Sequence, residues 1–356
     1  MVEVDVLERN LDRIADAAAS SGVSVRPHVK THKCPAIARR QLAHGAVGVT
    51  TATLGEASAM IASGVEDVLV YYPLVDERSI TAFLDLATRA LMATTVEDEA
   101  GIERLGAAAR RRGIRLDVLI DVDTGLGRTG VSLGSDLGHL AGIVERQSHL
   151  TLAGVATHEG FAYTIADPSQ RRDLVNERLG RFVEAGRALG VERISCGCTP
   201  SVHDAVRVDG ITEIRPGNYA FFDAMQVGLG VAVPDDCALT VLTTVVSNTS
   251  REAGIVDAGS KALSSDRGVH GAAGMTGYGL LRELPEIAIT ALSEEHGWLT
   301  MDSPARRLDV GERIRIVPNH ACATAANFDR LLLVSAGTAI EEATVARRRD
   351  GRLDGA

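Results

Sequence analysis

Short apolar runs alternate with amphipathic stretches from residue 23 to about residue 217 of the chain. The runs are rich in β-branched residues, as buried strands are, and the stretches between them have the hydrophobic period of helices. This alternation predicts βα units on a parallel sheet. The eight runs are VSVRPHV (23–29), AVGVTTA (46–52), DVLVYYP (67–73), ALMATT (90–95), LDVLIDVD (116–123), TLAGVATH (151–158), RISCG (193–197) and ITEIRPG (211–217).

Eight βα units of this length fit a closed (β/α)8 barrel better than an open doubly wound sheet, for which no G-x-G-x-x-G fingerprint is found. Helices are expected to begin near Lys33, Leu54, Asp76 and Val96, and a longer one lies within residues 167–190. The first part of the chain is therefore predicted to be a barrel of the α/β class.

After about residue 226 the chain changes to valine- and threonine-rich runs separated by turn residues, which predicts a mostly β second domain. These runs are ALTVLTTVVSNT (238–249), GIVDAG (254–259), RIRIVPNH (313–320) and RLLLVSAG (330–337). We expect a barrel over residues 5–225, a β domain over 226–345 and a flexible tail over 346–356.

The composition limits the partners that the protein can have. A content of 45% hydrophobic and 24% charged residues is typical of a well-cored globular protein, and a net charge of −10 with few aromatic residues argues against a nucleic-acid or membrane partner. A small-molecule substrate is favoured. The acidic N-terminus and the lack of a long apolar run lead us to expect a cytoplasmic protein. Five widely spaced cysteines are expected to be reduced thiols.

Lysine is rare in this chain, with only Lys30, Lys33 and Lys261 among 37 basic residues. Lys30 falls at the end of the first predicted strand, where barrels place their catalytic groups. Burial lowers the pKa of a lysine, so that its neutral amine can form a Schiff base. An ordinary loop cation is the alternative for Lys30. Lys33 is expected on the first turn of the following helix, in contact with solvent.

Two small-residue loops follow the seventh and eighth predicted strands, CGCTPS (196–201) and RPGNY (215–219). Barrels often bind a phosphate there, through backbone N–H groups. Gly197 and Gly217 allow close approach of the backbone, and Thr199 and Ser201 can donate hydroxyl hydrogen bonds. Each loop alone is ordinary, but together with a lysine at the first strand they suggest a phosphorylated aldehyde cofactor.

His320 and Cys322 are a candidate metal pair, because residues two apart in an extended segment point to the same face. Imidazole with thiolate is a zinc-like set of ligands. Two protein ligands would leave positions open for water and substrate, as a catalytic metal requires. A structural or coincidental pair is the alternative reading of these two residues.

Six motifs in this order make the chain resemble the fold-type III pyridoxal-phosphate enzymes, in the D-serine dehydratase and D-threonine aldolase branch related to alanine racemase. The resemblance runs from about Val4 to Glu342. The motifs are RPHVKTHK (26–33), VDTGLGRTG (122–130), THEGFAY (157–163), RPGNY (215–219), DAGSKALS (257–264) and PNHACAT (318–324).

The resemblance implies a pyridoxal 5'-phosphate bound to Lys30, with Arg128 bonded to the cofactor's phenolic oxygen and His158 and Tyr163 lining its ring. It implies a divalent metal at His320 and Cys322, with zinc favoured and magnesium or manganese as alternatives. A D-amino acid substrate and a homodimer are also implied. The residues implied to hold the phosphate are Gly197, Cys198, Thr199, Gly217 and Asn218.

Some features depart from the family pattern or extend it. The chain reaches its first helix early, so an edge strand of the β domain is expected to be missing or shortened. Cys198 stands where a second glycine is common, and its side chain is expected to crowd the phosphate. Cys196 and Cys198 are expected to pack at the strand end rather than to bind a metal. Asp257, Lys261 and Asp266 are expected to brace the metal region.

The family resemblance leaves more than one reaction open. A dehydratase would convert 3-hydroxy-D-amino acids, such as D-serine or 3-hydroxy-D-aspartate, to a keto acid and ammonia. An aldolase would cleave the Cα–Cβ bond to give glycine and an aldehyde. The His-x-Cys pair resembles the dehydratases, whereas the aldolases more often have His-x-Asp, so dehydration is favoured. A racemase would not need the metal, and a non-catalytic pyridoxal-phosphate carrier would not need the β domain.

Overall fold

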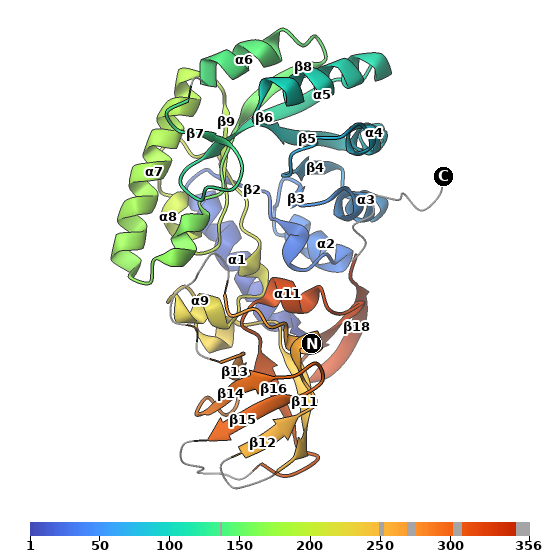
Figure 1. Ribbon diagram of the computed structural model, residues 1–356, viewed down its shortest axis with the longest axis vertical. Helices are drawn as coiled ribbons and strands as arrows, with labels where there is room; N and C mark the ends of the chain where they lie inside the picture. The colour runs from blue at the N-terminus through green and yellow to red at the C-terminus, as the bar shows by residue number, and fades with distance from the viewer. Residues whose placement is uncertain (136, 249–252, 269–274, 276, 302–307, 347–356) are drawn as a thin grey trace. The chain divides into compact units, whose positions relative to one another are not determined.

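The computed structural model describes residues 1–135, 137–248, 253–268, 275, 277–301 and 308–346 (Figure 1). Contacts divide the chain into two compact units. The barrel unit contains Asp12–Ala162, Ser169–Gly217 and Ala346–Ala356, and the β unit contains Met1–Leu11, Tyr163–Pro168 and Asn218–Val345. Residues 5–11, 163–168 and 218–225, which the sequence pattern placed with the barrel, thus fall in the β unit. The expected tail lies almost wholly outside the described residues.

The sheet of the barrel unit has eight parallel strands on its main path, as the apolar runs predicted. The two ends of this path meet at a bridge between His28 and Thr50, so the sheet closes as the predicted barrel. In spatial order the strands are β2 (Ser24–Val25), β10 (Glu213–Ile214), β9 (Arg193–Cys196), β8 (Leu150–Ala156), β6 (Leu116–Asp123), β5 (Leu91–Val96), β4 (Asp67–Val70) and β3 (Val49–Thr51), with β7 (Val131–Ser132) beside β6.

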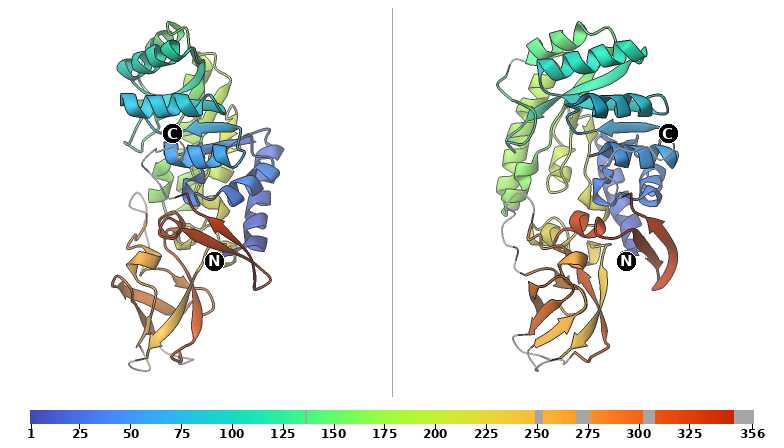
Figure 2. Two further views of the ribbon diagram at one scale, coloured as in Figure 1. Left: turned by 90° about the vertical axis from the view of Figure 1, so that its right-hand side faces the viewer. Right: turned by 45° about the vertical axis from the view of Figure 1, so that its right-hand side comes forward.

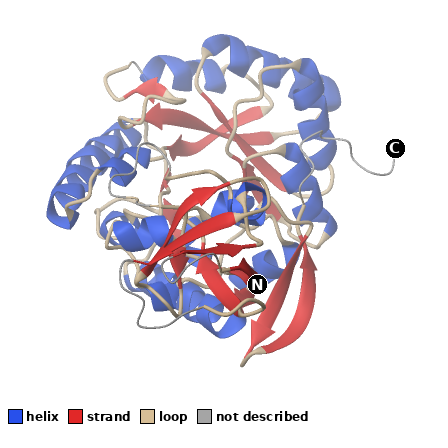
Figure 3. Ribbon diagram, turned by 60° about the horizontal axis from the view of Figure 1, so that its bottom comes forward, coloured by secondary structure: helices blue, strands red, loops and turns tan. Residues whose placement is uncertain are grey.

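Helices lie on the outside of this sheet (Figures 2 and 3). They are α2 (Pro35–Ala43), α3 (Leu54–Ala62), α4 (Glu77–Leu86), α5 (Glu99–Arg112), α6 (Leu137–Glu145), α7 (Pro168–Ala188) and α8 (Val202–Ala205). Side chains of Thr53, Asp76 and Asp98 cap α3, α4 and α5 by accepting backbone N–H bonds. The start expected near Val96 was wrong, because β5 runs on to that residue and the helix begins after its Asp98 cap. Within the described residues, no helix is long and apolar enough to cross a bilayer.

The β unit is built on a closed antiparallel barrel, which confirms the mostly β character of this part of the chain. Its core includes the fully buried side chains of Val245, Val256, Ile289 and Ile316. The strands are β11 (Val241–Ser247), β12 (Ala253–Val256), β15 (Gly297–Met301), β14 (Ile287–Leu292), β13 (Leu280–Leu281) and β16 (Arg313–Val317), and the short helices are α9 (Ala224–Gly228), α10 (Ser260–Leu263) and α11 (Ala321–Ala325).

A second sheet of the β unit joins strands from the two ends of the chain. β1 (Val2–Glu3) is parallel to β17 (Arg330–Ser335), which is antiparallel to β18 (Thr338–Thr344). β1 has two residues and precedes helix α1 (Val4–Ser20), so of the two expected outcomes, a missing or a shortened edge strand, this strand is present and short.

Candidate active site

Lys30 lies at the carboxyl end of the first barrel strand, as the sequence predicted. It is half-buried in a 3-10 turn, Val29–Thr31, that follows β2. The turn is capped by His28, whose Nδ1 accepts the backbone N–H of Lys30 at 3.4 Å. This cap fixes the backbone from which the amine of Lys30 extends.

The expectation for Lys33 was wrong, because this residue precedes α2 rather than lying on its first turn. Its φ of 51° is in the left-handed region, and Cys34 then caps the helix that begins at Pro35. The Lys33 Nζ is 3.6 Å from Oε1 of Glu56, and the side chain is only 18% exposed. Lys33 is thus engaged in a partly buried ion pair.

Two buried imidazoles, those of His28 and His158, lie within the electrostatic reach of Lys30. Burial lowers the pKa of both well below the ordinary histidine value, and the positive charges of Lys30, Arg128 and Arg215 lower it further. Both rings are therefore neutral at pH 7. The structure brings Lys30, Arg128 and His158 together, as the family resemblance implied for this part of the site.

A polar cluster inside the barrel was not found by sequence reasoning. The Tyr71 hydroxyl donates to Oδ1 of Asp121 at 2.5 Å, and Thr129, next to Arg128, donates to Oδ2 at 2.9 Å. The Arg215 guanidinium stacks 4.1 Å above the centre of the Tyr71 ring. Burial raises the pKa of Tyr71 and of Asp121. Strand alternation alone could have pointed to these inward-facing positions, since Leu69 and Leu119, two residues earlier, form the apolar layer of the barrel.

The two loop glycines are required by close backbone approach. A Cβ on Gly217 would lie 2.7 Å from Oγ1 of Thr31 and 2.9 Å from the carbonyl oxygen of His28, so this loop packs against the turn that carries Lys30. A Cβ on Gly197 would lie 2.7 Å from the carbonyl oxygen of Arg215. The loops after β9 and β10 therefore contact each other and the Lys30 turn.

The cysteines near these loops are buried neutral thiols. Burial raises the pKa of Cys196 and Cys198 well above the ordinary value, and the charge of Glu159 raises it further. The Ser201 hydroxyl lies 3.2 Å from the backbone carbonyl oxygen of Cys198, and Thr199 is buried as well. None of the five cysteines, all of which lie in the described residues, forms a disulfide, as expected from their spacing.

Two further predicted cofactor residues belong to the β unit. Tyr163 is buried in a 3-10 turn, Gly160–Thr164. Asn218 begins another such turn, Asn218–Ala220, and its Nδ2 donates to Oδ2 of Asp223 at 2.6 Å. The side-chain amide of Asn218 is therefore held by a buried carboxylate.

His320 and Cys322 lie together, but not for the reason given by the sequence. β16 ends at Val317, and His320 is the cap of α11, so the segment is a helix start rather than an extended strand. The two side chains hydrogen-bond with each other. A helical first turn, and not strand alternation, brings them into contact.

Asp266 holds the imidazole of His320, with Oδ2 lying 2.6 Å from Nδ1. Burial lowers the pKa of His320, but the charges and hydrogen bonds of Cys322 and Asp266 outweigh burial and raise it. The hydrogen bond from His320 lowers the pKa of Asp266. This contact leaves Nε2 of His320 as the nitrogen available to a metal.

Of the three residues expected to brace this region, only Asp266 contacts His320. Asp257 accepts hydrogen bonds from Thr243 and Thr244, and Lys261 pairs with Glu295 on the surface. Lys261 lies on α10 with a side chain that is 65% exposed, so it faces solvent and not His320. The bracing role expected for Asp257 and Lys261 was therefore wrong.

A brace that sequence reasoning missed is Asp223, which is fully buried. Its Oδ2 accepts the backbone N–H of Ala321 at 2.8 Å in addition to the Asn218 amide, and its Oδ1 accepts the N–H of Gln226 at 3.1 Å. One carboxylate thus fixes the start of α11 between His320 and Cys322. In the described part of the chain, no three His, Cys, Asp or Glu side chains form a metal cluster.

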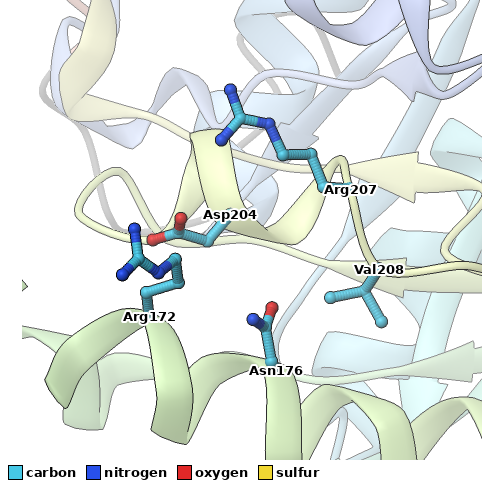
Figure 4. Close-up of a pocket in the computed structure, with 5 residues that line it drawn as sticks. All are labelled: Arg172, Asn176, Asp204, Arg207 and Val208. Atoms are coloured by element: carbon cyan, nitrogen blue, oxygen red, sulfur yellow. The ribbon is translucent and has the colours of Figure 1, made fainter. Parts of the chain in front are cut away.

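A separate cavity of about 240 Å³ lies between α7 and the segment around α8 in the barrel unit. The guanidinium of Arg172 faces the carboxylate of Asp204 at its edge (Figure 4). The lining residues are Arg172, Asn176, Asp204, Arg207 and Val208. None of the predicted cofactor or metal residues lines it.

The fold agrees with the comparisons to known proteins. Residues 2–225 match the family "Alanine racemase, N-terminal domain", and residues 238–334 match "Putative serine dehydratase domain". The chain belongs to the D-serine dehydratase and D-threonine aldolase family of fold-type III pyridoxal-phosphate enzymes, whose barrel is shared with alanine racemase. It is accordingly a lyase of this family.

Several relatives match over nearly the whole chain. D-threo-3-hydroxyaspartate dehydratase of Delftia sp. (strain HT23) is 34% identical over 96% of this chain and 94% of its own length. D-serine dehydratase of Dictyostelium discoideum is 30% identical over 91% of this chain and 89% of its own. The crystal structure of D-threonine aldolase from Filomicrobium marinum has a TM-score of 0.89, with 33% identity over 98% of this chain and 94% of its own.

Two other matched structures bear on the metal pair. One is a D-threo-3-hydroxyaspartate dehydratase with a histidine-to-alanine substitution, and the other has a cysteine-to-alanine substitution and is in a metal-free form. The two substituted positions in that enzyme are two residues apart. The same spacing separates His320 and Cys322 in this chain.

Proposed function

We propose that this protein is a pyridoxal-phosphate- and metal-dependent dehydratase of D-configured 3-hydroxy amino acids, such as D-serine or 3-hydroxy-D-aspartate. The products would be a keto acid and ammonia. The observation that carries the proposal is the contact of His320 with Cys322 and Asp266, in a chain that also presents Lys30 at the mouth of a barrel. D-threonine aldolase activity is the second candidate, supported by the close structural match to the Filomicrobium marinum enzyme.

The residues around Lys30 fit pyridoxal phosphate. Gly217 brings a small-residue loop against the Lys30 turn, and Arg128 provides a positive charge for a phenolic oxygen. When bound, the cofactor supplies an electron-withdrawing ring that makes the α-proton of an amino acid acidic. Lys30 is the amine placed to take up that proton. Because His28 and His158 stay neutral, they add no positive charge beside the amine of Lys30.

The residues around His320 fit a divalent metal with open positions. Imidazole and thiolate favour zinc, and the hydrogen bond of Nδ1 to Asp266 fixes the ring and its tautomer. An ion held there would supply a Lewis acid that helps the β-hydroxyl leave. Asp223 keeps the two ligands in register by holding the N–H of Ala321 between them.

A product assay tests the proposal. Purified protein is given pyridoxal phosphate, zinc and, in turn, D-serine, D-threonine and 3-hydroxy-D-aspartate, and keto acid with ammonia is measured against glycine with aldehyde. We expect keto acid and ammonia, and loss of turnover after dialysis against a chelator. Glycine as the main product from every substrate would make the protein an aldolase. Full activity after chelation, with the α-carbon inverted, would make it a racemase.

The homodimer and the cytoplasmic location expected from the sequence stay predictions. The assignment of Arg128, His158, Tyr163, Gly197, Cys198, Thr199, Gly217 and Asn218 to the cofactor is likewise part of this proposal. We propose that Thr199 and the loop around it face the phosphate.

A further inference from the structure

A fully buried carboxylate, that of Glu159, bonds the loop between β9 and α8 at two points. Its Oε2 accepts the backbone N–H of Gly197 at 2.9 Å, and its Oε1 accepts the hydroxyl of Ser201 at 2.8 Å. Glu159 follows the end of β8, whereas Gly197 begins the loop and Ser201 ends it. One side chain from a neighbouring strand therefore holds both ends of residues 197–201.

The position of Gly197 is fixed from two other directions. Nδ1 of His158 contacts the carbonyl oxygen of Gly197, so consecutive residues of one segment hold its C=O and its N–H. Its Cα faces the backbone of Arg215, where a Cβ would lie 2.7 Å from the carbonyl oxygen. The loop cannot shift at this residue without breaking these contacts.

Burying a carboxylate costs free energy of desolvation, so packing alone does not account for the fully buried Glu159. Burial raises its pKa, and the hydrogen bonds from Ser201 and Gly197 and the charge of Arg215 offset only part of that rise. A donor on each oxygen satisfies both acceptor atoms of the side chain. Ser201 directly precedes α8, and its side chain makes no capping bond but donates its hydroxyl hydrogen to Glu159.

We propose that Glu159 is the positioning residue of the phosphate-binding loop, which rests on the proposed function. Glu159 holds Gly197 and Ser201 and so orders residues 198–200 before the cofactor binds. The free energy of cofactor binding then does not include the entropy cost of ordering this loop. The N–H of Gly197 is committed to Glu159, so the N–H groups that this loop offers to the phosphate are those of the residues that follow Gly197. Glu159 acts on the phosphate and not on the aldehyde or the ring.

The test compares pyridoxal phosphate with pyridoxal, which has the same aldehyde and ring but no phosphate. The dissociation constants of both are measured on the full-length apoprotein from the absorbance change on binding. Glu159→Ala is expected to raise the constant for pyridoxal phosphate at least about tenfold and that for pyridoxal less than about twofold. Glu159→Gln keeps one acceptor oxygen, and Ser201→Ala keeps the bond to Gly197, so each is expected to weaken pyridoxal phosphate binding by about threefold.

A matched control removes a buried hydroxyl bond elsewhere in the barrel unit. Thr94 donates to the carbonyl oxygen of Val70 at 3.1 Å, and Thr94→Val is expected to leave both constants unchanged. Equal weakening of both ligands by Glu159→Gln and Ser201→Ala would show a general structural role and overturn the inference. Unchanged or tighter pyridoxal phosphate binding in these variants would overturn it as well. These two variants decide the matter if Glu159→Ala does not fold.

The wild-type protein separates this inference from the proposed function. If it binds pyridoxal as tightly as pyridoxal phosphate, no phosphate site exists, and the proposed cofactor is wrong. If it prefers pyridoxal phosphate and the variants keep that preference, the cofactor stands and the role of Glu159 is wrong.

Discussion

His320 Nδ1 lies 2.6 Å from Oδ2 of Asp266, a residue 54 positions earlier in the chain. A carboxylate on one ring nitrogen orients the imidazole and leaves the other nitrogen for a metal. This relationship supports the proposal that His320 and Cys322 bind a metal. The other charged residues of the segment DAGSKALSSD (257–266) have different partners, since Asp257 bonds Thr243 and Lys261 bonds Glu295.

Asp266→Asn is expected to lower the affinity for zinc by about 10- to 100-fold, because an amide orients the His320 ring less strongly than a carboxylate does. Competition with a chromophoric chelator measures this affinity. The control is Asp257→Asn, in the same segment, because Asp257 bonds Thr243 and Thr244 and not His320. Equal zinc affinities in wild type and Asp266→Asn would refute the bracing role.

The eight strands of the barrel unit were predictable from local sequence, whereas β13, β14 and β15 of the β unit match none of the runs that predicted strands. Each apolar run had enough β-branched residues to be a strand, and the cap residues Thr53 and Asp76 agree with the starts expected for α3 and α4. The segment around His320 was mistaken for an extended strand, because a five-residue helix such as α11 has too few turns to show a period.

The braces of the site were not predictable in the same way, because each joins residues far apart in the chain. Asp223 is 98 residues from Ala321, and Tyr71 is 50 residues from Asp121. A single sequence shows the residue types but not the partners that tertiary structure provides. Glu159 stood inside a recognised motif, yet its role became visible only when Gly197 and Ser201 were placed beside it.

His32 should make the barrel unit less stable as the pH is lowered. It is 0% exposed, with Nδ1 accepting the N–H of Cys34 and Nε2 bonded to Gln41, and burial lowers its pKa to about 4. Between about pH 6.5 and pH 4 the unfolded chain binds a proton that the folded chain does not. Stability should therefore fall as the pH falls through this window and change no further, from this residue, below it.

The free energy of unfolding of wild type and His32→Asn, measured by urea denaturation at pH 7 and pH 5, checks this expectation. The wild type should lose about 2 kcal/mol more than the variant between these two pH values. Other histidines titrate in both proteins, so only the difference is attributed to His32. The same loss in both proteins would show that His32 does not titrate in this window.

Gly217→Ala is expected to destabilise the protein by about 1–3 kcal/mol and to weaken retention of the cofactor. The added Cβ would lie 2.7 Å from Oγ1 of Thr31 and would push the turn that carries Lys30. Thermal unfolding and the rate of cofactor loss on dilution measure the two effects. Gly180→Ala in α7 is the control: no atom lies within 4 Å of its Cβ, so a gain of about 0.5–1 kcal/mol is expected. Normal stability and retention in Gly217→Ala would contradict the close packing.

The most direct test of the account is to find which lysine holds the cofactor. The candidates differ in surroundings, since Lys30 is half-buried beside His28, Lys33 pairs with Glu56, and Lys261 pairs with Glu295 on the surface. The protein loaded with pyridoxal phosphate is reduced with borohydride, digested and mapped by mass spectrometry. The account predicts the added mass on Lys30 and no modification in Lys30→Ala. Modification of Lys33 or Lys261 in the wild type, or of no lysine at all, would contradict it.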